Sequence, residues 1–214
     1  SAGYNNSSSG RTAFVGGGCA NSASGACSTV AGGGTNVATG ASSTVGGGFS
    51  NAASGCLSTI SGGRTHTASG LYSTISGGCC NIASGVLSTI GGGDKNDVTS
   101  GRAVIGGGFN NTASNTYSTV SGGYQNTASG TQSFVGSGLN NISSGARSVV
   151  VGGSSNTASG GQSTVGGGTS NTASGCRTTV AGGESNTDSA HWSFIGGGYL
   201  NIASAESVAV GGVV

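Results

Sequence analysis

The sequence predicts an all-β fold, a parallel β-solenoid (β-roll) of about fourteen coils with a 15-residue repeat. Val or Ile returns at every fifteenth position, Asn returns with the same period, and 48 of the 214 residues are Gly while none is Pro. One short repeat cannot bury its own apolar side chains, but stacked copies can. A period this short, held without insertions, is therefore typical of a solenoid.

The first repeating position predicts an aliphatic core ladder that runs through the stack. Each member is a branched aliphatic residue, which favours an extended backbone. The predicted core ladder consists of Val15, Val30, Val45, Ile60, Ile75, Ile90, Ile105, Val120, Val135, Val150, Val165, Val180, Ile195 and Val210.

The second repeating position predicts a buried Asn ladder. Stacked Asn side chains in cross-β assemblies bond the amides above and below them, and we expect the same pattern here. His66 replaces Asn in one coil and is expected to act as a hydrogen-bonding substitute. The predicted Asn ladder consists of Asn21, Asn36, Asn51, Asn81, Asn96, Asn111, Asn126, Asn141, Asn156, Asn171, Asn186 and Asn201.

Each repeat is expected to contain two short strands, as residues 118–120 (Ser-Thr-Val) and 126–129 (Asn-Thr-Ala-Ser) illustrate. Side chains alternate between the two faces of a strand, so Ser and Val share one face and Asn and Ala share another. We expect these four types to point inward. Glycines between the pieces supply turns, and their frequency disfavours helix.

The repeat runs almost from end to end, which predicts a single domain over residues 1–214 with no capping segment. An unpaired strand edge is a template for another strand. The sequence therefore predicts self-association, head-to-tail into a filament and possibly side by side, because a contact that does not close on itself continues indefinitely.

Composition excludes several function classes. The chain has six basic and five acidic residues and a formal net charge of +1, which gives no electrostatic footprint for nucleic acid. No apolar run is long enough to cross a membrane, so no membrane insertion is expected. No cofactor is expected either.

The repeating unit S-T-V-x-G-G-x-x-N-T-A-S-G resembles the head repeats of YadA-type trimeric autotransporter adhesins and the β-roll repeats of viral and phage fibres. The resemblance covers the chain from Asn6 to Gly212. It implies a β-roll at a cell or virion surface, in that family a trimer. The unit here is a 15-residue variant, one residue longer than the family's, and Thr stands at outward positions where the family carries aliphatic residues.

The six cysteines all fall in predicted turns. No pair except the adjacent Cys79 and Cys80 comes within disulfide distance on an ideal stack, and that bridge would be strained. Two readings stay open, free thiols or disulfides between chains. The candidate intermolecular disulfides use Cys19, Cys27, Cys56, Cys79, Cys80 and Cys176.

Variable turn residues form exposed columns that are candidate binding surfaces. An apolar column made of Leu57, Leu71, Tyr72, Val86 and Leu87 is a candidate interface, with simple ladder packing as the alternative.

A second column, formed by Phe109, Tyr124 and Leu139, fits ladder packing better than a glycan or surface ligand site. Three arginines on one edge are expected to be solvated charges: Arg102, Arg147 and Arg177.

No catalytic residue set is found, and the chain is not expected to be an enzyme. Asp188, Glu184 and His191 form only a weak candidate site, with Asp188 at an inward position that is costly for an unpaired charge. The cysteines lack Cys-x-x-Cys and Cys/His spacing, so no metal site is expected.

Three functions remain open. The first is a structural protein that forms an extracellular β-solenoid fibre by head-to-tail self-assembly. The second is a trimeric adhesin head or a viral or phage fibre shaft. The third is an ice-binding protein with an outward Thr row, which Phe14, Phe134, Phe194, Val104 and Val149 interrupt.

Overall fold

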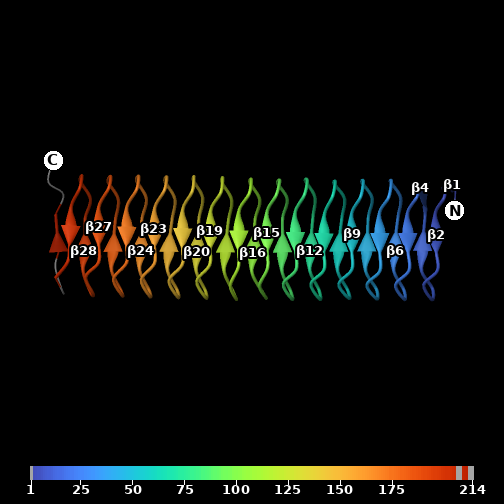
Figure 1. Cartoon of the computed structure of the whole chain (residues 1–214), viewed down its shortest axis with the longest axis horizontal. Helices are drawn as coiled ribbons and strands as arrows, with labels where there is room; N and C mark the ends of the chain where they lie inside the picture. The colour runs from blue at the N-terminus through green and yellow to red at the C-terminus, as the bar shows by residue number, and fades with distance from the viewer. Residues whose placement is uncertain (1, 206–208, 212–214) are drawn as a thin grey trace. The chain divides into compact units, whose positions relative to one another are not determined.

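The computed structural model describes residues 2–205 and 209–211, except for the side chains of Ala2 and Val210. The described residues form short parallel β-strands and turns, and among them no helix is long and apolar enough to cross a membrane. The chain divides into two compact units, Ser1–Gly108 and Phe109–Val214. Figure 1 shows the same coil recurring along each unit. The predicted parallel β-solenoid is confirmed.

The first unit contains two parallel sheets of two-residue strands and a short pair at its beginning. The pair is β1 (Ala2–Tyr4) with β4 (Gly17–Cys19). One sheet runs β3 (Phe14–Val15), β6 (Thr29–Val30), β8 (Thr44–Val45), β10 (Thr59–Ile60), β12 (Thr74–Ile75), β14 (Thr89–Ile90) and β16 (Val104–Ile105). The other runs β2 (Ser7–Ser8), β5 (Ser22–Ala23), β7 (Val37–Ala38), β9 (Ala52–Ala53), β11 (Thr67–Ala68), β13 (Ile82–Ala83) and β15 (Asp97–Val98).

The second unit repeats this arrangement with two further runs of parallel strands. One run is β18 (Thr119–Val120), β20 (Phe134–Val135), β22 (Val149–Val150), β24 (Thr164–Val165), β26 (Thr179–Val180), β28 (Phe194–Ile195) and β30 (Ala209–Val210). The other is β17 (Thr112–Ala113), β19 (Thr127–Ala128), β21 (Ile142–Ser143), β23 (Thr157–Ala158), β25 (Thr172–Ala173), β27 (Thr187–Asp188) and β29 (Ile202–Ala203).

The register between neighbouring strands equals the sequence period. Ile60 of β10 pairs with Val45 of β8 on one side and with Ile75 of β12 on the other. The strand N–H groups point toward the next coil, as in the 2.9 Å bond from the Thr59 nitrogen to the Ser73 oxygen. A one-residue shift within a strand would turn its inward side chains to the outer face, so the strands keep one register along the stack.

In most coils the interior is built from four side-chain types, one of each, with replacements such as His66, Val98 and Asp188 in single coils. Val or Ile and Ser come from one strand, and Ala and Asn come from the other. In the core ladder, the side chains from Val30 to Ile195 are fully buried and that of Val15 is nearly so. Val210 pairs through its backbone with Ile195, and its side chain lies outside the described part. This thin interior relies on backbone hydrogen bonds as well as apolar burial.

In the described coils, two turns place a non-glycine residue in the left-handed region of φ. Cys27 and Leu57 occupy one turn and Thr35 and Thr65 the other, with φ between 52° and 58°. The positive φ reverses the peptide, so the Leu57 nitrogen donates backward to the Ala41 oxygen at 2.8 Å while its strand neighbours donate forward. Each coil therefore bonds to its neighbours in both directions. The sequence pattern gave no sign of these residues, which include Leu, Tyr, Arg and Trp.

The Asn side chains join the coils mainly through the backbone, unlike the amide-to-amide ladder that the sequence predicted. Asn36 Nδ2 donates to the Gly32 oxygen at 2.9 Å and to the Gly48 oxygen in the next coil at 2.8 Å. Its Oδ1 accepts the backbone N–H of Asn51 at 3.0 Å. Amide-to-amide bonds are added in places, as from Asn51 to Asn36 at 3.1 Å. The glycine carbonyls of the turns therefore accept the hydrogen bonds of the Asn36 amide nitrogen, within its own coil and from the next.

His66 takes the Asn place and reproduces part of the pattern. Its backbone N–H donates to Asn51 Oδ1 at 3.0 Å, and its Nδ1 accepts the Asn81 N–H at 3.1 Å. An imidazole that accepts at Nδ1 carries its proton on Nε2 and is neutral. Burial lowers the pKa of His66.

Protonation of His66 is expected to destabilise the fold. The unfolded chain takes up this proton near the ordinary pKa of about 6.5, before the folded chain does. The free energy of unfolding should therefore fall as the pH drops from about 7 through 6.5 toward the lower folded pKa.

His66→Asn should remove this pH dependence, because Asn fits the ladder and does not titrate. Chemical unfolding from pH 8 to pH 5 measures the free energy of unfolding of both proteins. The difference between the two proteins at pH 8, where His66 is neutral in both the folded and the unfolded chain, serves as the reference. Burial raises the pKa of Asp97, so protonation of Asp97 stabilises the fold as the pH falls further. Both proteins contain Asp97, so this contribution cancels when their free energies of unfolding are compared. Parallel curves for the two proteins would contradict the role assigned to His66.

Candidate functional site

The predicted apolar interface lies exposed on one turn of the first unit. Leu57, Tyr72 and Leu87 occupy the same left-handed turn position in successive coils, with φ of 57° to 59°. Their exposed fractions range from 42% to 49%, and those of the flanking Leu71 and Val86 are 39% and 48%. Backbone bonds hold the column in register, with Leu87 N donating to the Leu71 oxygen at 2.8 Å. The arrangement is a continuous apolar stripe.

The second predicted column stacks directly in the other unit. The rings of Phe109 and Tyr124 lie with centroids 5.0 Å apart and planes 12° from parallel, and Leu139 pairs next to Tyr124. This spacing follows from the coil-to-coil distance, because neighbouring strands lie about 4.8 Å apart. Aromatic packing therefore accounts for the column.

Arg147 and Arg177 do more than face solvent, in contrast to the expectation. Arg147 Nε donates to Gln132 at 3.2 Å, and Arg177 Nε donates to Gln162 at 2.6 Å. The Arg177 guanidinium also lies 4.2 Å from the centre of a Trp192 ring. The fifteen-residue register places these partners one coil apart. They are overlooked when each arginine is considered without the residue fifteen positions away.

The weak Asp188, Glu184 and His191 candidate is not assembled. Asp188 is fully buried and accepts hydrogen bonds from Ser193 and, at 3.3 Å, from the Ala190 N–H. His191 instead accepts the Cys176 N–H at 3.1 Å, and Glu184 pairs in an exposed column between Thr169 and Tyr199. The side chains of Asp188 and His191 therefore bond to different neighbours, and Glu184 is placed in the exposed column by backbone bridges.

All six cysteines are free thiols in the single chain. Cys19, Cys27 and Cys56 are exposed, and Cys79, Cys80 and Cys176 are half-buried. Cys27 Sγ lies 3.2 Å from Thr12 Oγ1. The exposed thiols can reach another chain, which leaves the intermolecular disulfides a prediction.

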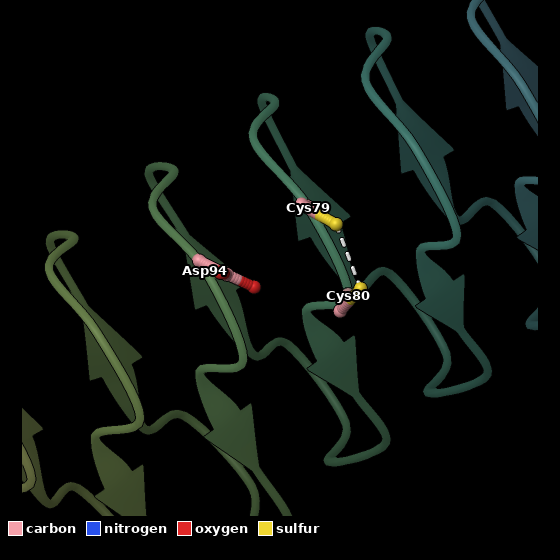
Figure 2. A group of neighbouring side chains, drawn as sticks. All are labelled: Cys79, Cys80 and Asp94. Carbon is pink, nitrogen blue, oxygen red and sulfur yellow. Dashed lines mark hydrogen bonds between the residues drawn. The ribbon is translucent and has the colours of Figure 1, made fainter.

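Three ligand-type side chains meet at one turn of the first unit, and we call Cys79, Cys80 and Asp94 the dithiol cluster. Their sulfur and carboxylate oxygen atoms all lie within 4.8 Å of one another. The two sulfurs are 2.7 Å apart and share a hydrogen bond. Figure 2 shows both cysteines on one coil and Asp94 on the next, projecting in the same direction as Cys79.

The local fold builds the cluster by stacking. Arg64, Cys79 and Asp94 hold the same position in successive coils and pair as parallel bridges. Arg64 Nη2 donates to Cys79 Sγ at 3.5 Å. The left-handed φ of Cys80, 59°, turns its side chain beside that of Cys79. Short sequence spacings missed the cluster because its third member comes from the next coil. The repeat period could have found it, since Asp94 lies fifteen residues after Cys79.

The two thiols differ in pKa because they are hydrogen-bonded to each other. The hydrogen bond from Cys80, followed by that from Arg64, lowers the pKa of Cys79. The same hydrogen bond to Cys79, with burial, raises the pKa of Cys80. Cys79 is therefore the sulfur that ionises first, and Cys80 holds the remaining proton.

Comparison with known families gives one match. Residues 118–130 match the Ubiquitous surface protein adhesin repeat, which is a single repeat of this chain. A search of curated proteins gives no match. The stacked β-solenoid and this match together support a repeat protein of a structural or adhesin-like kind.

Proposed function

We propose that this chain is a structural protein that forms an extracellular β-solenoid fibre by head-to-tail stacking of copies. The carrying observation is that the main-chain hydrogen bonds between coils follow one repeated pattern along each unit. Strand N–H groups donate to the residue fourteen positions on, turn residues donate sixteen positions back, and the Asn side chains bridge the coils. A coil of a second copy can accept the same set of bonds.

Several features of the surface support an extracellular role. The matched repeat belongs to a family of surface adhesins. The chain has only eleven charged side chains, six basic and five acidic. Like-charge repulsion between stacked copies is therefore small. Exposed thiols such as Cys19, Cys27 and Cys56 can cross-link neighbouring chains once they reach an oxidising compartment.

The purified chain should form filaments as its concentration rises. Electron microscopy should show filaments of one constant width, and fibre diffraction should show a repeat of about 4.8 Å along the axis. A fusion with a bulky globular domain at one end should block growth, since it covers the stacking face. Dispersed monomers at every concentration, or normal filaments from the fusion protein, would contradict head-to-tail assembly.

The adhesin-repeat match favours a second candidate, a trimeric adhesin head. This function predicts a particle of three chains with a fixed mass, which light scattering distinguishes from a filament. The interior of a single coil is already closed, with Val120, Ala128 and Asn126 fully buried. A trimer would therefore have to form through outward residues such as the half-buried Thr119.

Ice binding is the least supported of the three functions. In the first unit the outward Thr column from β6 to β14 ends against Val104 on one side and Phe14 on the other. Phe14 is 57% exposed and breaks the plane of hydroxyl groups. In the second unit, Phe134 and Val149 interrupt the corresponding column between Thr119 and Thr164.

A further inference from the structure

We propose that the dithiol cluster binds a thiophilic divalent cation of the zinc type, with the Cys79 and Cys80 sulfurs and an Asp94 carboxylate oxygen as ligands. Thiolates and carboxylates are both zinc ligands, and thiolates favour such ions over magnesium or calcium. The site is independent of the fibre proposal. It is the one group of three such ligand atoms among the described residues.

The geometry needs only a small side-chain adjustment. Zinc binds sulfur at about 2.3 Å, so tetrahedral coordination separates two sulfurs by about 3.8 Å. The present separation is 2.7 Å, and rotation about the two Cα–Cβ bonds widens it. Backbone bonds hold the frame, from Cys79 N to the Gly93 oxygen at 2.9 Å and from Cys80 N to the Arg64 oxygen at 2.8 Å.

The carboxylate of Asp94 provides the second, independent observation. Its Oδ1 atom is shielded from solvent and accepts no hydrogen bond. A buried polar atom without a partner is costly, and a bound ion is one of its ordinary explanations. A cation between Asp94 and the two sulfurs supplies the missing interaction.

Charge balance favours the filled site. Two thiolates and one carboxylate carry three negative charges, a divalent cation carries two positive charges, and the guanidinium of Arg64 supplies the third. Arg64 already contacts Cys79 Sγ at 3.5 Å. A thiol must lose its proton to bind a metal, so both sulfurs are counted here as thiolates. The fourth coordination position is left for water.

Cys19 provides a matched control within the chain. It occupies the same turn position as Cys79 in an earlier coil, where Ala20 replaces the second cysteine and Gly34 replaces the carboxylate. If turn thiols bound metal in general, Cys19→Ser would reduce metal binding. If the dithiol cluster is the site, Cys19→Ser should leave metal binding unchanged.

The test titrates Cd²⁺ and then Zn²⁺ into the full chain under a non-thiol reductant. Cd²⁺ should give thiolate-to-metal charge-transfer absorbance that saturates at one ion per chain, and calorimetry should give the same stoichiometry for Zn²⁺. Cys79→Ser and Cys80→Ser should abolish the saturable absorbance. Asp94→Asn, which keeps the size of the side chain, should weaken binding by at least about tenfold. Cys19→Ser should bind as the unaltered chain does.

A second measurement separates metal binding from loss of the fold. Zn²⁺ should raise the unfolding midpoint of the unaltered chain, because it links two coils of the folded state, and should not raise that of Cys79→Ser. Absence of saturable binding to the reduced chain would overturn the proposal. Saturable binding that survives Cys80→Ser, or unchanged affinity in Asp94→Asn, would overturn it as well.

Discussion

Gly33→Ala is expected to destabilise the first unit by about 3 kcal/mol or more. Gly33 has a φ of 90°, a conformation that side chains disfavour. A Cβ atom there would lie 2.1 Å from the Gly48 oxygen of the next coil and 2.7 Å from Asn36 Nδ2. The neighbouring coil cannot move away without breaking its own hydrogen bonds. Backbone strain at residue 33 and lost contacts between the coils therefore both lower the free energy of unfolding.

The preceding residue, Gly32, is the matched control. A Cβ added there meets nothing within 4 Å, and Ser137 occupies the equivalent position in another coil. Gly32→Ala should therefore leave the free energy of unfolding within about 0.5 kcal/mol of its original value, or raise it slightly through the unfolded state.

Chemical unfolding followed by circular dichroism measures both glycine variants. Amide hydrogen exchange in the coil of Gly48 adds a local reading, because repeat proteins do not always unfold in one step. Equal midpoints for Gly32→Ala and Gly33→Ala would show that the close approach of the coils at Gly33 is not required.

Asn141→Ser is expected to destabilise the second unit by about 2–4 kcal/mol. Asn141 Nδ2 donates to the Ser137 oxygen at 3.0 Å and to the Gly153 oxygen at 2.9 Å, and its Oδ1 accepts the Asn156 N–H at 3.0 Å. Serine is too short to replace all three bonds. The loss leaves buried backbone groups without partners, each of which costs about 1–3 kcal/mol.

The adjacent Asn140→Ser is the control for this substitution. Asn140 is exposed with a φ of 53°, and serine occupies the equivalent left-handed position at Ser155 and Ser170. Its unfolding midpoint should stay close to that of the original chain. In Asn141→Ser, by contrast, the Asn156 amide should exchange with solvent much faster, and unchanged protection there would contradict the role of the Asn side chain.

Much of the fold was predictable because a constant repeat constrains every coil at once. The spacing of Val30, Val45 and Ile60 predicted a parallel stack in register, and the structure pairs these residues directly. Alternation along each strand was enough to expect Ser and Val on one inner face. The left-handed turns were not predictable, since Leu57 or Trp192 is not a residue that such a φ normally selects.

The candidate sites were harder to predict than the fold. The exposed apolar column could be found from the sequence, because its members repeat with the period of the fold. The dithiol cluster was missed because metal-site motifs are defined by short spacings along one strand or loop. Asp94 comes close to Cys79 only when the coils stack.

The sequence by itself determined the period, the register and the residue types that fill the interior, because each is repeated along the chain. Only the tertiary structure decided which atoms the Asn side chains bond, which turn residues adopt a positive φ, and which side chains of neighbouring coils meet. These features depend on where one coil lies against the next, a distance of a few ångströms that no local sequence preference encodes.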